Sequence, residues 1–382
     1  MRPHTLDIMT WRRVLVLAGV VLIGARATSL AQVAEPRRAA SLPDTAFAAA
    51  VVRLSEPGGY FDSDNLISNE TSYLHVATRL DRDGVRGGAY VGVGPDQNFS
   101  YIAIIRPTVA FLLDIRRDNM LQHLMYKVLF AASTNRLDFL CRWLGRVPPA
   151  DLPAWTGRPV EQLMAWVDRA PVDPRWQARV ARETLAQVEA LGIPLESRDR
   201  DVLSRFHAEF MRRGLELRFS SFGRGDDPTR PTLRTLLLAT DLDGTPRSFL
   251  AREADWMFVR DLQAAGRVIP VVGDLAGARA LPAVADEVRR RALVLSAIYT
   301  SNAEQYVWRD GGFPAFAATL ARFPVDARSV VIRSVFDRGG ALPLAVPGHR
   351  SVQLLQGVRD FNRHQRAGAF RTYRDVVTLD AR

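Results

Sequence analysis

Short apolar runs alternate with helical patterns along most of this chain. The apolar runs are Ala89–Val93, Thr108–Leu113, Leu233–Ala239, Val268–Val272, Leu293–Ile298 and Ser329–Val335. The helical patterns between them are Asn98–Ile105, Asp118–Phe130, Phe249–Ala264, Ala278–Arg291, a segment around Glu304, and Pro314–Arg322. Apolar strands separated by helices are typical of a mainly parallel sheet that is covered on both faces. The pattern therefore predicts an α/β fold with a doubly wound, mainly parallel sheet.

Residues 135–230 interrupt this alternation. Proline and glycine breaks, among them Gly157-Arg158-Pro159, precede two amphipathic helical patterns at Arg175–Leu191 and Arg198–Arg213. The sequence thus predicts a large helical insertion or cap at 135–230. The α/β domain is then divided into a first part at 46–134 and a second part at 231–382.

The N-terminus has the layout of an export signal. Arginines at positions 2, 12 and 13 precede the apolar run Val14–Ala25 and the small-residue cleavage site Ser29-Leu30-Ala31. Residues 1–31 are therefore predicted to be a signal peptide, and residues 32–45, rich in Ala, Pro and Arg, a linker. The Arg12-Arg13 pair also partly matches a twin-arginine signal, so the export route is open. The apolar run is short for a membrane span, although an uncleaved anchor remains an alternative.

Composition narrows the class of partner. The formal net charge of the 382-residue chain is +10, but Lys127 is its one lysine and no arginine run carries interleaved aromatic residues, so nucleic acid is not an expected partner. Cys141 is the one cysteine, which excludes an intrachain disulfide and a cysteine-based metal site. The six histidines show no metal-ligand spacing. An exported protein is expected, periplasmic or secreted, with no stable membrane span after cleavage.

The first two strands carry a candidate nucleotide site. Gly92 and Gly94 punctuate a turn between the run Ala89–Val93 and a helix, and Asp114 ends the next run about 20 residues later. Glycines let a ligand approach the backbone, a helix N-terminus offers unpaired N–H groups, and a carboxylate can accept ribose hydroxyls. This spacing predicts a nucleotide-type site.

Three further segments are candidates for the same crevice, because the carboxyl ends of parallel strands meet at one edge of a sheet. Gly273-Asp274 follows the run Val268–Val272, and the polar and aromatic segment Tyr299–Tyr306 follows another run. The polar segment Phe61–Glu70 has many side-chain acceptors, which suggests either helix caps and turns or a wall of the site.

These features resemble class I S-adenosylmethionine-dependent methyltransferases over about residues 85–135 and 265–336. In that Rossmann-like family a glycine turn holds the amino-acid part of the cofactor, an acid that ends the second strand binds the ribose, a pair after the third strand flanks the adenine, and the segment after the fourth strand meets the substrate. The resemblance implies cofactor contacts by Gly92, Gly94, Asp96, Gln97, Asn98, Asp114, Gly273 and Asp274. It implies substrate-orienting, catalytic roles for Tyr299, Asn302 and Glu304.

The resemblance implies methyl transfer from S-adenosylmethionine to an unknown acceptor, in a poorly characterised bacterial exported branch. Asp96 stands where the family has its third glycine, and Ala89 and Tyr90 stand near the place of its first-strand acid. A non-catalytic envelope protein with a degenerate version of the fold is therefore an alternative. A second alternative is a phosphatase, because Thr240–Thr245 reproduces the haloacid-dehalogenase nucleophile motif with Asp241 first.

Overall fold

The computed structural model describes residues 44–382, apart from 64, 223–226, 337–341 and 343. The expected signal peptide at 1–31, and the expected linker as far as residue 43, lie outside the described residues. In the described part, no helix is both long enough and apolar enough to cross a membrane.

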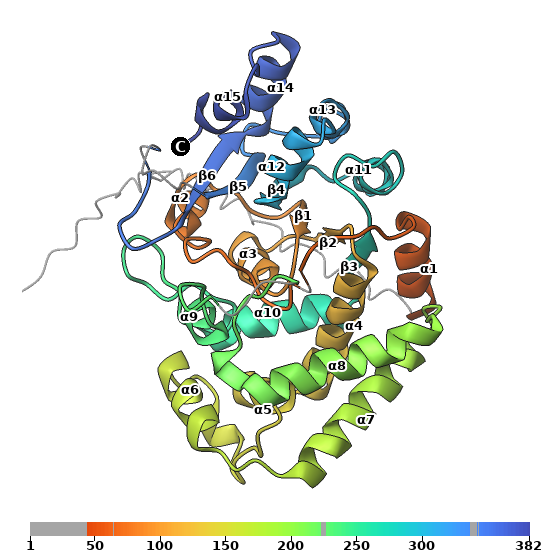
Figure 1. Ribbon diagram of the computed structural model, residues 1–382, viewed down its shortest axis with the longest axis vertical. Coiled ribbons are helices and arrows are strands. Elements are labelled where there is room, and N and C mark those ends of the chain that lie inside the picture. Colours follow the sequence, from red (N-terminus) through yellow and green to blue (C-terminus); the bar gives the residue numbers. More distant parts are fainter. Residues whose placement is uncertain (1–43, 64, 223–226, 337–341, 343) are drawn as a thin grey trace, which may run out of the picture. The chain divides into compact units, whose positions relative to one another are not determined.

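A six-stranded mixed sheet forms the centre of the fold (Figure 1). Its strands are β1 (Ala89–Val93), β2 (Val109–Asp114), β3 (Val268–Val272), β4 (Leu295–Ser301), β5 (Val330–Phe336) and β6 (Ser351–Gly357), in the spatial order β3-β2-β1-β4-β5-β6. Neighbouring strands are parallel except for β6, which is antiparallel to β5. The first three strands in sequence are almost completely buried, as expected for strands covered on both faces. The predicted α/β class and mainly parallel sheet are confirmed.

The helices pack around the sheet in two groups. One group contains α3 (Gln97–Ile105), α4 (Arg117–Ala132) and α10 (Glu253–Ala264), which contact one another, and α4 lies on β2 and β3. The other group runs from α1 (Asp44–Leu54), which also contacts β3, through α11 (Ala280–Arg290) and α13 (Phe313–Leu320) to α14 (Val358–Arg366). The remaining short helices of this part are α2 (Ala77–Arg82), α12 (Ala303–Arg309) and α15 (Tyr373–Thr378).

The segment predicted as an insertion is helical. It contains α5 (Arg136–Trp143), α6 (Val160–Arg169), α7 (Pro174–Ala190) and α8 (Ser197–Arg213). Helices α7 and α8 pack against each other and against α4, which therefore joins them to the sheet (Figure 1).

The apolar run Leu233–Ala239 is not a strand, contrary to the prediction. It forms the short helix α9 (Leu233–Leu237), whose N-cap is Thr232: the Thr232 hydroxyl oxygen accepts the backbone N–H of Thr235 at 3.1 Å. The buried leucines at 233, 236 and 237 have helical spacing, so the cap and this spacing favour a helix over a strand.

Strand β6 is a further difference from the prediction, since no strand was expected there. Ser334 of β5 and Gln353 of β6 are directly opposite each other in the antiparallel pair. On the other side of β6, Leu355 exchanges two backbone hydrogen bonds of 2.8 Å with Arg382.

Candidate functional site

A cleft opens at the carboxyl ends of β1, β2, β3 and β4. Its volume is about 1630 Å³, and it lies where the strand order reverses between β1 and β4. Open α/β sheets bind ligands at this point, because the loops that leave adjacent strands diverge there. Of the residues singled out in the sequence, Gly94, Gln97, Asp114, Gly273, Asp274 and Asn302 line the cleft. Gly92, Asp96, Asn98, Tyr299 and Glu304 lie outside its lining.

Gly92 is a glycine for packing reasons. A Cβ at this position would overlap the side-chain oxygen of Asn98 and would be 2.7 Å from the hydroxyl of Tyr90. Asn98 is held firmly there, since its Nδ2 donates to the carbonyl oxygens of Val93, Gly94 and Pro95 at 2.9–3.1 Å and its Oδ1 accepts from Tyr90. Gly92 and Asn98 thus build the turn rather than contact a ligand.

Gly94 is the glycine that the turn itself requires. Its φ of +90° lies in the region that L side chains rarely adopt, and it lines the cleft. His123 Nε2 donates to its carbonyl oxygen at 2.9 Å. Burial lowers the pKa of His123 to about 4, so the ring is neutral and acts as a fixed donor behind the turn.

Asp96 is buried directly after this turn. Its Oδ1 has no hydrogen-bond partner among the described residues. Burial raises the pKa of Asp96 to about 7, because removal from water disfavours the charged form. The residue that replaces the third glycine of the family motif is therefore a poorly solvated acid beneath the cleft.

Asp114 is already paired. Its carboxylate accepts the backbone N–H of Arg116 at 2.9 Å and both ends of the guanidinium, Nε at 3.1 Å and Nη2 at 3.0 Å. Both side chains are more than nine-tenths buried and line the cleft. Of the four acceptor positions of a carboxylate, one on Oδ2 stays open to a ligand.

The turn after β3 is held by a residue outside the expected set. Glu56 accepts the backbone N–H of Asp274 at 2.8 Å and that of Ala280, at the start of α11, at 3.1 Å. Asp274 Oδ1 accepts the N–H of Ala276 at 2.9 Å, and a Cβ on Gly273 would meet Ala280. Gly273 is therefore a packing position, while Asp274 presents its second oxygen at the cleft.

A bulge at the end of β4 brings a second acid beneath the cleft. Pairing with β5 shifts by one residue between Tyr299 and Ser301, and Ser301 has a φ of +53°. Such strained backbone persists where surrounding contacts hold it. Here the hydroxyls of Ser301 and Tyr299 both donate to Glu70, whose side chain is completely buried. Burial raises the pKa of Glu70, opposed by these hydrogen bonds.

Glu304 lies on the other side of β5 from this bulge. It forms a fully buried ion pair with Arg333, with Nε to Oε2 at 2.7 Å and Nη2 to Oε1 at 3.2 Å. Arg333 also donates to Gln356 and to the carbonyl oxygen of Val376. The carboxylate therefore ties α12 to the C-terminal strands and lies outside the lining of the cleft.

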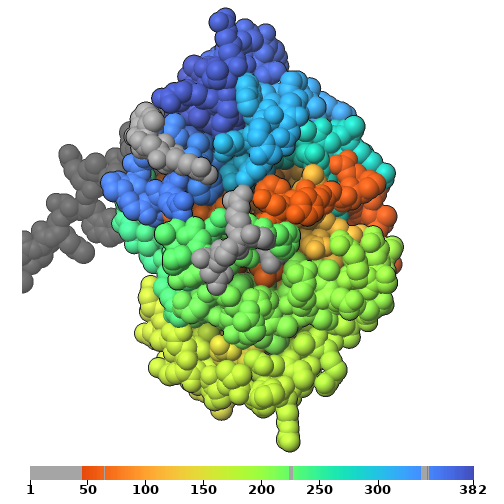
Figure 2. All heavy atoms as spheres, viewed as in Figure 1, coloured from red at the N-terminus to blue at the C-terminus, as the bar shows by residue number. Residues whose placement is uncertain are grey.

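The polar segment 61–70 lines the cleft and also forms local turns, in which Ser63 and Ser68 accept the backbone N–H groups of Asn65 and Glu70. Phe61, Asp62, Asn65, Ser68 and Asn69 all line the cleft. In the space-filling view the orange segment that follows α1 lies at the surface between the green and blue parts (Figure 2).

Aromatic rings beside this wall of the cleft offer flat surfaces on which a planar group of a ligand could stack. The rings of Phe61 and Tyr306 meet edge to face with centroids 5.2 Å apart, and the Arg309 guanidinium lies 4.9 Å from the centroid of the Tyr306 ring. Tyr60 and Trp308 line the cleft beside them.

The charges of the lining nearly cancel. Of the described residues that line the cleft, five are aspartates (Asp62, Asp114, Asp227, Asp274 and Asp310) and four are arginines (Arg116, Arg230, Arg309 and Arg350). Each of these arginines forms an ion pair with one of the aspartates. Among the described residues, Asp62 and Asp274 form no ion pair, whereas Arg230 and Arg350 share the carboxylate of Asp227.

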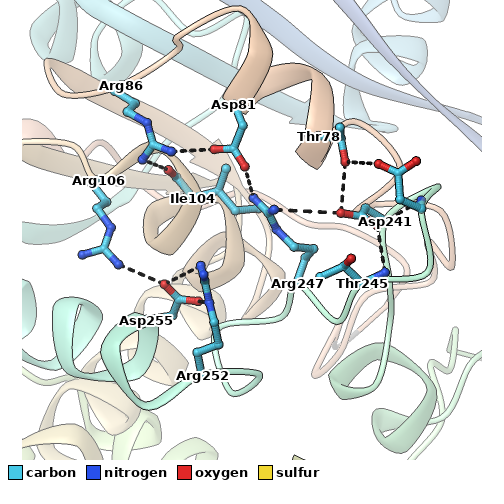
Figure 3. Close-up of polar contacts among 11 residues, drawn as sticks. Thr78, Asp81, Arg86, Ile104, Arg106, Asp241, Thr245, Arg247, Arg252 and Asp255 are labelled. Atoms are coloured by element: carbon cyan, nitrogen blue, oxygen red, sulfur yellow. Dashed lines mark hydrogen bonds and ion pairs between the residues drawn. The ribbon is translucent and has the colours of Figure 1, made fainter.

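Asp241, the candidate phosphatase nucleophile, lies outside the cleft lining in a saturated turn (Figure 3). Its Oδ1 accepts the backbone N–H groups of Asp243 at 3.0 Å and Thr245 at 2.9 Å. Its Oδ2 accepts the Thr78 hydroxyl at 3.0 Å, and Arg247 is 3.9 Å away. The turn follows helix α9 rather than a strand, and the carboxylate has little freedom to attack a phosphorus atom.

The metal-binding chemistry of the site is limited. Across the described residues, no three His, Cys, Asp or Glu side chains come together in a way that could hold a metal ion. His349 lines the cleft, where its Nδ1 is 2.9 Å from the Thr71 hydroxyl, and burial lowers its pKa. A neutral histidine at the cleft is a hydrogen-bonding group here.

Three residues of the site were missed in the sequence, Glu56, Arg116 and His349, and Glu70 was named only as the end of the polar segment 61–70. The sequence did contain a signal for Arg116, because an arginine two residues after Asp114 can fold back and pair with that carboxylate. Glu56 precedes the polar segment and Glu70 ends it, but their partners lie more than two hundred residues away along the chain.

Comparison with known proteins gives one family. A family described as Domain of unknown function (DUF7790) matches residues 66–147 and 220–377, which include the strands, the glycine turn and the segment after β4. The stretch between the two matched ranges carries α6, α7 and α8. No curated protein matches the chain.

Proposed function

We propose that the protein binds a nucleoside of the S-adenosylmethionine type and transfers the methyl group of this nucleoside to an acceptor. The chain belongs to the DUF7790 family, whose function is unknown, so the proposal rests on the cleft. The observation that carries this proposal is the charge of the cleft at the switch point of the sheet. Among the described residues, every lining arginine forms an ion pair, with Arg230 and Arg350 sharing Asp227, while Asp62 and Asp274 form none.

This charge pattern separates classes of nucleotide ligand. A polyphosphate needs unpaired cationic groups or a bound metal ion, and arginines occupied by carboxylates are poor phosphate ligands. A ligand with a sulfonium cation instead gains from two unpaired carboxylates in a partly enclosed cleft. The pattern supports a phosphate-free, positively charged nucleoside.

The lining residues fit such a ligand in three respects. Phe61 and Tyr306 offer an aromatic wall for a purine ring. Asp114 keeps one acceptor position for a ribose hydroxyl, although Arg116 holds the rest of its carboxylate. Gln97 lines the cleft, and its buried Oε1 has no partner among the described residues, so a ligand donor that displaced its neighbours slightly could satisfy it.

The cleft also has room for a second molecule. Small-molecule sites usually enclose about 300–1,000 Å³, and this cleft measures about 1630 Å³. When bound, the cofactor supplies an already activated methyl group. The contribution of this chain would be alignment and exclusion of water, with Ser301 and Asn302 at the end of β4 facing the acceptor.

A second candidate function is binding without catalysis, as in a non-catalytic envelope protein. The Asp114–Arg116 pair favours it, because a ribose would have to share its acid with an arginine. The two functions predict the same binding and differ in turnover, so methyl transfer must be measured separately.

Calorimetric titration tests the binding proposal. The protein is titrated with S-adenosylmethionine, with S-adenosylhomocysteine, which lacks the sulfonium charge, and with ATP. We expect binding of the two nucleosides, weaker binding of ATP, and a loss of about tenfold in S-adenosylmethionine affinity for Asp274→Asn, with a smaller loss for S-adenosylhomocysteine. The matched control is Asp201→Asn, an exposed aspartate on α8 outside the cleft. Absence of heat with either nucleoside would reject the proposal.

Export belongs to the same proposal. Cleavage after Ala31 would place the protein outside the cytoplasm, and the Arg12-Arg13 pair would select the twin-arginine route. Fractionation of cells that express a reporter fused after this leader tests it. Retention of Arg12→Lys/Arg13→Lys in the cytoplasm would assign the twin-arginine route, and normal export would assign the general secretory route.

A further inference from the structure

Two buried acids of the described part lack an arginine partner, Glu70 and Asp96. The other buried acids each form an ion pair with an arginine: Asp114, Asp138, Asp199, Asp241, Asp255, Glu287 and Glu304. Glu70 differs from Asp96 in having a complete shell of hydrogen-bonding groups. These are the hydroxyls of Tyr299, Ser301 and Ser334 and the backbone N–H of Asn302.

The donors and acceptors of this shell can be assigned from Tyr101 onward. Its hydroxyl is 2.5 Å from the carbonyl oxygen of Tyr73, which can only accept. The single phenolic hydrogen therefore goes to Tyr73, and the Tyr101 oxygen accepts from Gln353 Nε2 at 2.9 Å. This fixes the amide of Gln353 with its oxygen toward Ser334.

Ser334 then has no hydrogen left for Glu70. Its one hydroxyl hydrogen goes to the oxygen of Gln353, which is an acceptor only. Yet Ser334 Oγ also lies 2.5 Å from Glu70 Oε2, a hydrogen-bonding distance. The hydrogen in that contact must come from Glu70.

A proton on Glu70 Oε2 satisfies every other member of the shell. The hydroxyl of Tyr299 donates to the same oxygen, while Ser301 and the N–H of Asn302 donate to Oε1. Burial raises the pKa of Glu70, which acts in the same direction.

We propose that Glu70 is a neutral carboxylic acid in the native protein at neutral pH and is the positioning residue of the cleft. By accepting the hydrogen of Ser301, it leaves Ser301 with only acceptor lone pairs toward the cleft. The site then selects a ligand that presents an N–H or O–H donor at this point, such as an ammonium group. This second step rests on the proposed function, whereas the protonation of Glu70 does not.

The groups that face Glu70 are neutral. Tyr90 of β1, Tyr101 of α3 and Tyr299 of β4 are the titratable ones, and burial raises the pKa of each phenol above its ordinary value. From β5 and β6 the facing groups are Ser334 and Gln353. Arg333, next to Ser334 in sequence, points to the opposite side of β5, where it pairs with Glu304.

Infrared difference spectroscopy of the ligand-free protein tests the protonation. At pH 7 we expect the carbonyl band of neutral carboxylic acids in the wild type, with one component lost in Glu70→Gln and another, from Asp96 near its pKa, lost in Asp96→Asn. If Glu70→Gln does not fold, Asp96→Asn still decides, because the component that remains in it belongs to Glu70. No neutral-acid band in Asp96→Asn at pH 7 would overturn the proposal.

The pH dependence of unfolding gives a second readout. A folded-state pKa above the unfolded value of about 4.3 means that the wild type loses stability relative to Glu70→Gln as pH rises from that value, by up to about tenfold in the unfolding equilibrium constant per pH unit. Above the folded pKa the difference becomes constant. A difference that is the same at pH 5 and at pH 7 would contradict a neutral Glu70.

Ligand binding separates this inference from the proposed function. We expect Ser301→Ala to weaken S-adenosylmethionine binding about tenfold, Glu70→Gln to leave it nearly unchanged, and Glu70→Ala to weaken it. If the wild type does not bind the nucleoside, the proposed function is rejected, while the infrared spectra still test whether Glu70 is protonated. If Ser301→Ala binds the nucleoside as tightly as the wild type, the positioning role of Glu70 is rejected.

Discussion

The amide oxygen of Asn98 occupies the space that a side chain would need at Gly92. A Cβ on Gly92 would overlap that oxygen and would be 2.7 Å from the Tyr90 hydroxyl. The first glycine of the turn is thus explained by packing within the protein. A glycine motif can resemble a ligand-binding loop in the sequence even where the glycine is required only by packing within the turn.

Gly92→Ala should destabilise the protein by about 3 kcal/mol, because Asn98 is fixed by four hydrogen bonds and cannot move aside. Chemical denaturation measures the change. Gly157→Ala is the control, since its Cβ would meet nothing within 4 Å and only its φ of +78° opposes it. The control should cost about 1 kcal/mol, and an equal cost for the two variants would contradict the packing explanation.

Asp114→Asn should destabilise the protein by about 3 kcal/mol, because it removes a carboxylate charge that pairs with the buried guanidinium of Arg116. Adding Arg116→Gln to that variant should recover part of the loss. A double-mutant cycle from denaturation curves measures the coupling. Additive effects would mean that the pair contributes nothing as a pair.

Asp96→Asn should remove a pH dependence of stability. The pKa of Asp96 is raised to about 7 in the folded protein, so the wild type loses stability as pH rises from about 4 to 7, by roughly 4 kcal/mol in total. The asparagine variant lacks that ionisation and should become the more stable form near pH 7 and above. Thermal melts from pH 5 to 8 measure it, and parallel curves for the two proteins would contradict a raised pKa.

Glu304→Gln should destabilise the protein by about 3 kcal/mol without changing ligand affinity. The reason is that Arg333, wholly buried, loses the charge that compensates it. Denaturation and calorimetric titration at a temperature where the variant is folded measure the two effects. A change in affinity at full stability would restore Glu304 to the substrate site.

Five of the six strands could be predicted because they are buried on two faces and read as continuous apolar runs. Strand β6 could not, since Ser351, Gln353 and Gln356 are buried polar residues that break its run. Their partners explain the burial: Gln353 bonds Ser334 and Tyr101, and Gln356 accepts from Arg333. The run at Leu233–Ala239 was predicted as a strand but is a helix, because a short apolar run of this length fits both a capped helical turn and a short strand.

The place of the cleft followed from strand order, and Gly94, Asp114, Asp274 and Asn302 do line it. The role of each side chain did not follow, because it depends on which partner reaches it. Asn98 turns to its own loop, Glu304 to Arg333, and Glu70 to Ser334, 264 positions away. The sequence shows that an acidic residue is present, while only the fold shows which groups already bind its carboxylate.

The two hydrogen bonds between Leu355 and Arg382 bear on how copies of this protein meet in concentrated solution. A strand at the border of a sheet with free N–H and carbonyl groups is a template for pairing with a strand of another molecule. At Leu355 these groups are taken by Arg382, at 2.8 Å each. Arg382 therefore occupies hydrogen-bonding groups of β6 that a strand of another molecule would need in order to pair there.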